Sequence, residues 1–134
     1  MPTPGDFKFT IPATYDVKTQ DIVDLIVTMI ETPMGSWLQA AHRGSTIEPT
    51  ESPWYSCVDY WQKGGKMTLD VENPDNGRCK IVENISLVPH VRDALSKMAM
   101  QAPHQFKDLI SDNMDAETAD VFGQFLAYGE IIYG

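Results

Sequence analysis

The sequence is poor in the residues that build disulfide and metal frameworks. Its 134 residues include two cysteines, Cys57 and Cys79, and three scattered histidines. Two cysteines are too few for a disulfide framework, and neither has a partner at C-x-x-C spacing. The histidines form no H-x3-H or HExxH pattern, so a zinc site is not expected. The sequence therefore predicts a protein without a metal or other cofactor.

Basic residues are also scarce. Ten lysines and arginines stand against nineteen aspartates and glutamates, which gives a formal net charge of −9 at pH 7. A protein with that charge repels nucleic-acid phosphates and anionic membranes. We therefore expect no direct binding to nucleic acid or to a membrane, whereas a basic partner surface would be attracted. The same charge could equally serve only to keep the protein soluble.

Long apolar runs are missing. The longest apolar stretch, at 22–30, is interrupted by Asp24 and Thr28 and is too short to span a bilayer. The first six residues contain neither the basic segment nor the apolar segment of a secretory signal. We therefore expect a cytoplasmic protein.

Catalytic sequence motifs are missing as well. The chain has no GxSxG motif, and 64–66 lacks the glycine spacing and the Ser or Thr of a phosphate-binding loop. Cys57 with His90 or His104, or a pair of carboxylates, remains open as a catalytic group, because sequence separation does not give spatial distance. We expect a protein that is not an enzyme.

The residues that are present predict one folded α+β domain covering 1–134. A chain of this length with 43% hydrophobic residues can bury one core and is too short for two. Periodicity and turn residues predict helices at 19–31, 36–43 and 54–63, from Ser86 to Pro103 and from Asp115 to Tyr128, with a further helical turn at 106–110. They also predict a strand at 6–11, a β-hairpin near 66–83, a mobile loop at 44–53, and a short strand or docked tail at 130–133. The predicted fold is a small antiparallel sheet of three to four strands packed against three to five helices.

Aromatic residues are dense in the middle of the chain. Five large aromatic side chains occur between positions 37 and 61, and a single member of such a group is more often a core residue than a binding residue. Five exceed what two short helices need for burial, and exposed Trp and Tyr are typical of binding hot spots and stacking platforms. Nearby basic residues could hold an anion or could be a solvated rim. The predicted ligand-binding or partner-binding residues are Trp37, Arg43, Trp54, Tyr55, Tyr60, Trp61 and Lys66.

Both ends of the chain and one middle segment carry motifs. Residues 21–31, followed by Trp37, fit the pattern DIxDLxVTxxE. Residues 60–69 place two glycines before a strand, and 115–134 are similar to DAxxADxxxQxxLFGExxYG. These stretches resemble an uncharacterised family of small bacteriophage and prophage accessory proteins. The sequence departs from the family at 33–34, where glycines are expected, and at Tyr128, where Phe is expected. The resemblance implies a phage accessory protein acting inside a bacterium, and by analogy a counter-defence factor.

Three functions follow from these observations. The first is a non-enzymatic protein that inhibits a host defence or nucleic-acid-handling protein by protein–protein contact, because the chain combines acidic charge with surplus aromatics. The second is a sponge for a small nucleotide-type signal, in which aromatics beside Arg43 or Lys66 hold the base and its phosphates. The third is a structural or assembly component of the phage, for which self-association as a homo-oligomer would be the sign.

Overall fold

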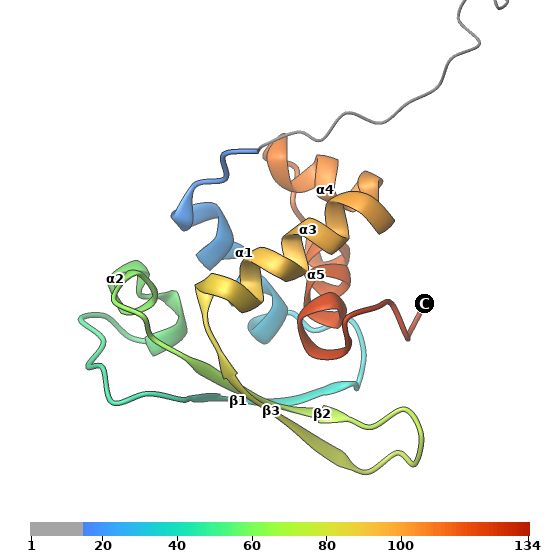
Figure 1. Ribbon diagram of the computed structural model, residues 1–134, viewed down its shortest axis with the longest axis horizontal. Helices are drawn as coiled ribbons and strands as arrows, with labels where there is room; N and C mark the ends of the chain where they lie inside the picture. The colour runs from blue at the N-terminus through green and yellow to red at the C-terminus, as the bar shows by residue number, and fades with distance from the viewer. Residues whose placement is uncertain (1–14) are drawn as a thin grey trace, which may run out of the picture.

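The protein combines a three-stranded antiparallel sheet with a group of helices packed on one of its faces (Figure 1). The structure, a computed structural model, describes residues 15–134. The strands are β1 (Leu38–Arg43), β2 (Met67–Glu72) and β3 (Cys79–Ile85), in the sheet order β1-β2-β3. The predicted α+β class with a small antiparallel sheet is confirmed. The strand predicted at 6–11 lies outside the described residues.

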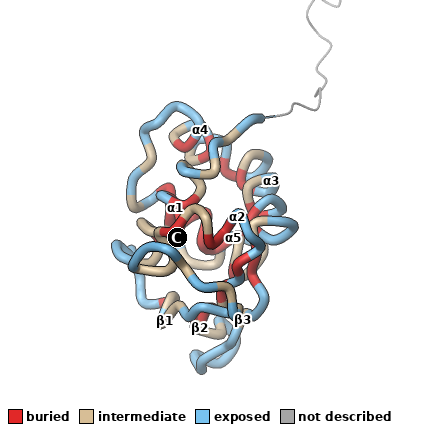
Figure 2. Tube along the Cα trace, turned by 90° about the vertical axis from the view of Figure 1, so that its left-hand side faces the viewer, coloured by how far each residue is buried: buried red, intermediate tan, exposed pale blue. Residues whose placement is uncertain are grey.

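The helices include two short irregular segments. The longer helices are α1 (Thr19–Glu31), α3 (Arg92–Gln101), α4 (Pro103–Ile110) and α5 (Ala116–Tyr128). The shorter ones are the 3-10 turn η1 (Trp54–Ser56), the helix α2 (Val58–Gln62) and the π turn η2 (Leu87–Val91). Buried segments concentrate where α1 and α5 face one another and the inner side of the sheet (Figure 2).

The predicted β-hairpin is formed by β2 and β3. Alternate residues of β2, namely Met67, Leu69 and Val71, are fully buried against the helices, while the residues between them lie on the outer face. The turn between the strands contains Gly77 in the left-handed conformation, with a φ of 73°, which glycine adopts without steric strain. Asp70 and Ile81 are paired across the two strands on the outer face.

The helix predicted at 36–43 is wrong, because Leu38–Arg43 form β1. This segment pairs antiparallel with β2, with Leu38 opposite Val71 and Ala41 opposite Leu69. The apolar spacing fits both a short helix and an edge strand. Pairing with a distant strand decides between them, because local propensity over so few residues is weak.

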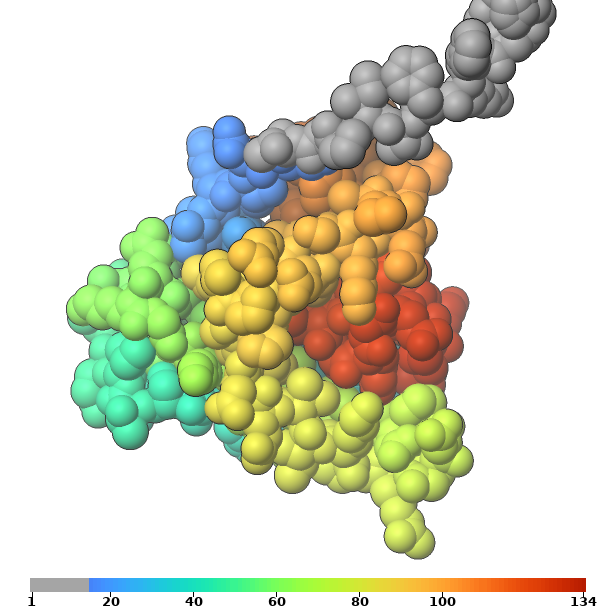
Figure 3. Space-filling model, viewed as in Figure 1, coloured from blue at the N-terminus to red at the C-terminus, as the bar shows by residue number. Residues whose placement is uncertain are grey.

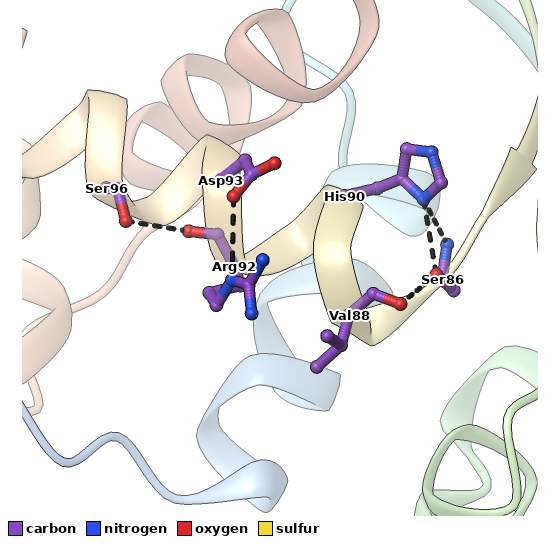
Figure 4. A network of polar contacts seen from close by, with 6 residues as sticks. All are labelled: Ser86, Val88, His90, Arg92, Asp93 and Ser96. Atoms are coloured by element: carbon purple, nitrogen blue, oxygen red, sulfur yellow. Dashed lines mark hydrogen bonds and ion pairs between the residues drawn. The ribbon is translucent and has the colours of Figure 1, made fainter.

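The segment after β3 also differs from its prediction. A single helix from Ser86 to Pro103 was expected, but a π turn comes first and α3 begins only at Arg92. The Ser86 hydroxyl donates to the Val88 carbonyl oxygen at 2.7 Å, and His90 Nδ1 accepts from the Ser86 backbone N–H at 3.2 Å (Figure 4). α3 ends at Gln101, close to the end that Pro103 predicts, and Pro103 itself lies in the first turn of α4, where a missing N–H is tolerated.

Helix α5 has the limits that its sequence predicts. The Asp115 side chain accepts from the Thr118 backbone N–H in a capping box, and that hydrogen bond lowers the Asp115 pKa. Gly129 ends the helix in the left-handed conformation. Gly123 lets α1 and Trp37 approach closely, since a Cβ there would lie 2.8 Å from both Met29 Sδ and Trp37 Cη2.

Candidate functional site

Four of the five predicted aromatic residues meet around η1 and α2. Trp54 contacts the other three rings, with ring centroids 5.4 Å from Tyr55, 5.6 Å from Tyr60 and 6.1 Å from Trp61. The contacts with the two tyrosines are edge-to-face, an arrangement that aromatic rings favour. We call Trp54, Tyr55, Tyr60 and Trp61 the aromatic cluster.

The inner half of the aromatic cluster belongs to the core. Tyr60 is 0% exposed and Trp61 is 1% exposed. The Trp61 indole N–H donates to the Tyr55 carbonyl oxygen at 2.9 Å, and the Tyr60 hydroxyl donates to the Lys66 carbonyl oxygen. A Cβ at Gly65 would lie 2.4 Å from the Tyr60 ring, so the chain needs glycine at this position. The prediction that Tyr60 and Trp61 contact a ligand or partner is therefore wrong for this fold.

The outer half of the cluster reaches the surface. Trp54 and Tyr55 are partly buried, and the Tyr55 hydroxyl donates to Glu31 Oε2 at 2.8 Å. That hydrogen bond raises the Tyr55 pKa. The Trp54 indole N–H has no acceptor within the described part of the chain, and it is not among the buried polar atoms that lack a partner. Trp54 is therefore the tryptophan whose side chain is partly exposed, and its indole N–H is left without an acceptor among residues 15–134.

The loop at 44–53 is attached to the aromatic cluster through Tyr60 and to the neighbouring residues Cys57 and Lys66. Ser45 Oγ lies 2.9 Å from the Tyr60 hydroxyl, and the Gly44 backbone N–H donates to the Lys66 carbonyl oxygen at 2.8 Å. Thr50 Oγ1 lies 3.4 Å from the buried Cys57 thiol, and this contact lowers the Cys57 pKa. Among residues 15–134, no histidine is hydrogen-bonded to that thiol. The loop contains no regular secondary structure, and its mobility stays a prediction.

The basic residues beside the cluster are largely neutralised. Arg43 Nη1 lies 3.6 Å from Glu48 Oε2, and Lys63 Nζ lies 2.9 Å from Asp59 Oδ2. Lys66 holds the loop and Tyr60 through its backbone, while the residue itself is exposed. Two of the three cations therefore already face carboxylates, which gives a bound phosphate little unpaired positive charge.

Trp37 lies apart from the aromatic cluster. It is 4% exposed, its ring meets the Tyr128 ring at 5.8 Å, and its indole N–H donates to Asp120 Oδ1 at 2.7 Å. Both its apolar surface and its polar atom are used inside the chain. The prediction that Trp37 contacts a ligand or partner is therefore wrong as well.

Trp37 belongs to a second group of residues, which the sequence did not reveal. Gln124 is 0% exposed, and its Oε1 accepts from the backbone N–H groups of Ile132 and Tyr133 at 2.8 and 2.7 Å. Its Nε2 donates to the Tyr133 carbonyl oxygen at 2.8 Å and to Asp120 Oδ2 at 2.9 Å. The segment at 130–133 is thus a docked tail and not a strand. Asp120 and Gln124, which carry part of the family resemblance, have a structural role here.

Two tyrosines extend this group to the end of β2. The Tyr128 hydroxyl donates to the Glu72 carbonyl oxygen, and the Tyr133 hydroxyl lies 3.2 Å from Glu72 Oε1. Burial raises the Tyr128 pKa well above its usual range. We call Trp37, Asp120, Gln124, Tyr128 and Tyr133 the C-terminal network. It joins the sheet, α5 and the tail.

Other parts of the surface offer less chemistry. An open hollow of about 290 Å³ lies between the start of α1 and the end of α4, and it contains none of the predicted site residues. Its lining residues are Asp16, Val17, Lys18, Asp21, Leu109, Ile110 and Asp112. Within residues 15–134, no group of His, Cys, Asp and Glu side chains has the arrangement of a metal site. No helix in the same range is long and apolar enough to cross a membrane.

Comparison with known proteins identifies no relative of this chain. No protein-family model, no curated protein and no solved structure matches this chain.

Proposed function

We propose that this protein is a non-enzymatic binding protein that contacts a partner protein through the outer half of its aromatic cluster. The observation that carries the proposal is the environment of Trp54. Trp37 and Trp61 are buried and their indole N–H groups are paired, whereas Trp54 is partly exposed and has no acceptor in the described chain. Exposed tryptophans that combine apolar area with a free donor are typical of interface hot spots.

The surroundings of Trp54 favour tight binding because they are already ordered. Its ring packs against Tyr60 and Trp61, which are fixed in the core, and Tyr55 is held by Glu31. A side chain that is held in place before binding loses little conformational entropy when the complex forms. Trp54 is therefore suited to fill a pocket in a partner without a large ordering cost.

The charge of the chain indicates the kind of partner. A net charge of −9 attracts a basic protein surface and accelerates its association at low ionic strength. Nucleic-acid-handling proteins carry such surfaces where they hold the phosphate backbone. Together with the resemblance to phage accessory proteins, this supports inhibition of a host defence or nucleic-acid-handling protein as the role of the complex.

The decisive experiment compares Trp54→Ala with a matched surface variant. The protein is immobilised, its partner is recovered from bacterial lysate and purified, and affinities are then measured by calorimetry. Trp54→Ala should lower the affinity about 30-fold or more, since hot-spot truncations cost about 2 kcal/mol or more. Met100→Ala is the control, because Met100 is 84% exposed on α3 and belongs to neither aromatic group. Equal affinity of the Trp54→Ala variant and the parent protein would refute the aromatic contact.

Ionic strength and native mass provide two further checks. Raising the salt concentration should weaken the complex and mainly slow its formation, because salt screens the attraction between the acidic protein and a basic partner.

Native mass spectrometry of protein recovered gently from cells distinguishes the sponge hypothesis from the inhibitor hypothesis. A retained nucleotide-sized mass would favour the sponge over the inhibitor.

A further inference from the structure

Glu31 is held beside the exposed aromatic rings and faces no cation. It is the last residue of α1, and its Oε2 accepts a hydrogen bond from the Tyr55 hydroxyl at 2.8 Å. Its Oε1 accepts no hydrogen bond within residues 15–134, and no ion pair in the same range involves Glu31. Tyr55 therefore fixes an exposed carboxylate while one oxygen and the negative charge stay available.

The end of α1 adds to the negative potential around Glu31. Helix carbonyls place a partial negative charge at the C-terminus, where a nearby lysine or arginine is favourable. The last turn of α1 nevertheless ends in an acidic residue and contains no basic one. Two basic residues beside the aromatic cluster, Arg43 and Lys63, already face other carboxylates. A positive group from outside the chain would therefore be stabilised at this position.

The aromatic rings next to Glu31 suit a cation as well. Trp54 and Tyr55 are both partly exposed, and their rings meet at 88° with centroids 5.4 Å apart. The faces of aromatic rings attract cations, and tryptophan attracts them most strongly. The space-filling view shows the segment that carries these rings, η1 and α2, at one side of the molecule next to α1 (left in Figure 3). Two aromatic rings and a carboxylate are thus joined at the surface through Tyr55.

We propose that the corner formed by Trp54, Tyr55 and Glu31 binds an arginine side chain of the partner protein. A guanidinium group is planar, so it can lie against an aromatic ring while its N–H groups donate to the carboxylate. The ammonium group of lysine lacks this planar shape, and a quaternary ammonium has no N–H to donate. This inference rests on the proposed function and specifies the partner as a basic surface that presents an exposed arginine.

A hexa-arginine peptide tests the corner on the full-length protein. Binding is followed by the NMR resonance of the Trp54 indole N–H, which is identified as the indole signal that is missing from Trp54→Phe. Hexa-arginine should shift this resonance saturably. Hexa-citrulline has nearly the same shape without the charge and should leave the resonance in place. An equal shift with hexa-citrulline, or equally tight binding of hexa-lysine, would overturn the proposal.

Two matched variants separate Glu31 from the net charge of the protein. Glu31→Gln removes the charge but keeps an acceptor for the Tyr55 hydroxyl. Glu130→Gln is the control, because it makes the same charge change at an exposed position after α5. The C-terminal segment lies on the opposite side of the molecule from α2 (Figure 1).

The two variants should differ in their affinity for hexa-arginine. Glu31→Gln should weaken binding about threefold to fivefold, as for the loss of a contact between exposed charges. Glu130→Gln should leave the affinity nearly unchanged, because the peptide at the corner does not reach that position. Equal weakening by the two variants would show that only the net charge matters and would overturn the proposal.

The purified partner separates this inference from the proposed function. If both hold, Glu31→Gln and Trp54→Ala each weaken the complex in calorimetry. A loss of affinity in Trp54→Ala alone would indicate an apolar pocket in the partner, which would overturn the arginine contact and leave the proposed function intact. An affinity equal to that of the parent protein in both variants would overturn both.

Discussion

The aromatic cluster and the C-terminal network use similar residues for different purposes. Each contains a tryptophan in edge-to-face contact with a tyrosine. In the C-terminal network the Trp37 indole N–H and the whole Gln124 amide have partners inside the chain. In the aromatic cluster the outermost indole N–H, on Trp54, has none in the described residues. Aromatic density therefore does not itself indicate binding, and the presence of an unpaired polar atom is the more informative sign.

The difference has an energetic basis. A buried donor or acceptor without a partner costs about 1–3 kcal/mol, so a fold retains a buried tryptophan only where an acceptor is at hand. A surface tryptophan carries no such requirement, because water accepts its hydrogen bond. The C-terminal network is thus expected to contribute mainly to stability and Trp54 mainly to partner affinity.

The largest expected effect is at Gln124. Gln124→Leu keeps most of the side-chain volume but leaves the backbone groups of Ile132 and Tyr133 without partners. We expect the free energy of unfolding to fall by about 2–3 kcal/mol, measured by urea denaturation, together with faster amide exchange at these two positions. Gln62→Leu, at an exposed site in α2, is the control and should stay within about 0.5 kcal/mol of the parent. A stable Gln124→Leu variant with a protected tail would contradict the structural role.

The next effect separates the three tryptophans. Trp37→Phe and Trp61→Phe should each lower the free energy of unfolding by about 1–3 kcal/mol, because each leaves a cavity and an acceptor without its indole donor. Trp54→Phe should cost less than about 1 kcal/mol, since its indole N–H has no acceptor in the described chain. Denaturant titrations of the three variants measure the difference. Equal losses would erase the distinction between the two buried tryptophans and Trp54.

A smaller effect appears at alkaline pH. Burial raises the Tyr128 pKa, so the folded protein keeps this hydroxyl protonated after an unfolded tyrosine, with its pKa near 10, has ionised. Its contribution to stability is fully present below about pH 10 and is lost as the pH rises from there through the folded pKa. The difference in unfolding free energy between the parent and Tyr128→Phe should therefore shrink between about pH 9 and pH 11. A difference that stays constant over this range would argue against a buried, neutral Tyr128.

The smallest effect is expected at Tyr55. Tyr55→Phe removes the hydrogen bond to Glu31 at a solvent-accessible position, and water replaces it on the carboxylate. The free energy of unfolding should change by no more than about 0.5 kcal/mol at neutral pH. Thermal denaturation of Tyr55→Phe, measured side by side with Trp61→Phe, checks this prediction. A loss as large as that of Trp61→Phe would show that the outer half of the aromatic cluster also maintains the fold.

Local patterns were sufficient for part of the structure. The limits of α5 follow from Asp115 at its start and Gly129 at its end, because the capping box and the left-handed terminus involve only nearby residues. The β2–β3 hairpin follows from alternation in β2 and a turn with Gly77, again over a short span. The same kind of pattern was ambiguous at 36–43, because strand pairing with β2 is not encoded in the segment itself.

The candidate functional site depends more than α5 or the β2–β3 hairpin on contacts between residues that are far apart in the sequence. The sequence by itself determined that this is an acidic α+β chain with surplus aromatics in its middle, as composition and short-range periodicity are sufficient for that. Only the tertiary structure decided that Trp37 is a core residue and that Trp54 reaches the surface. The acceptor for Trp37 is Asp120, 83 positions along the chain, so no local pattern could reveal it. Burial and hydrogen-bond pairing arise when remote segments pack together, and they separate a structural tryptophan from one that is free to bind.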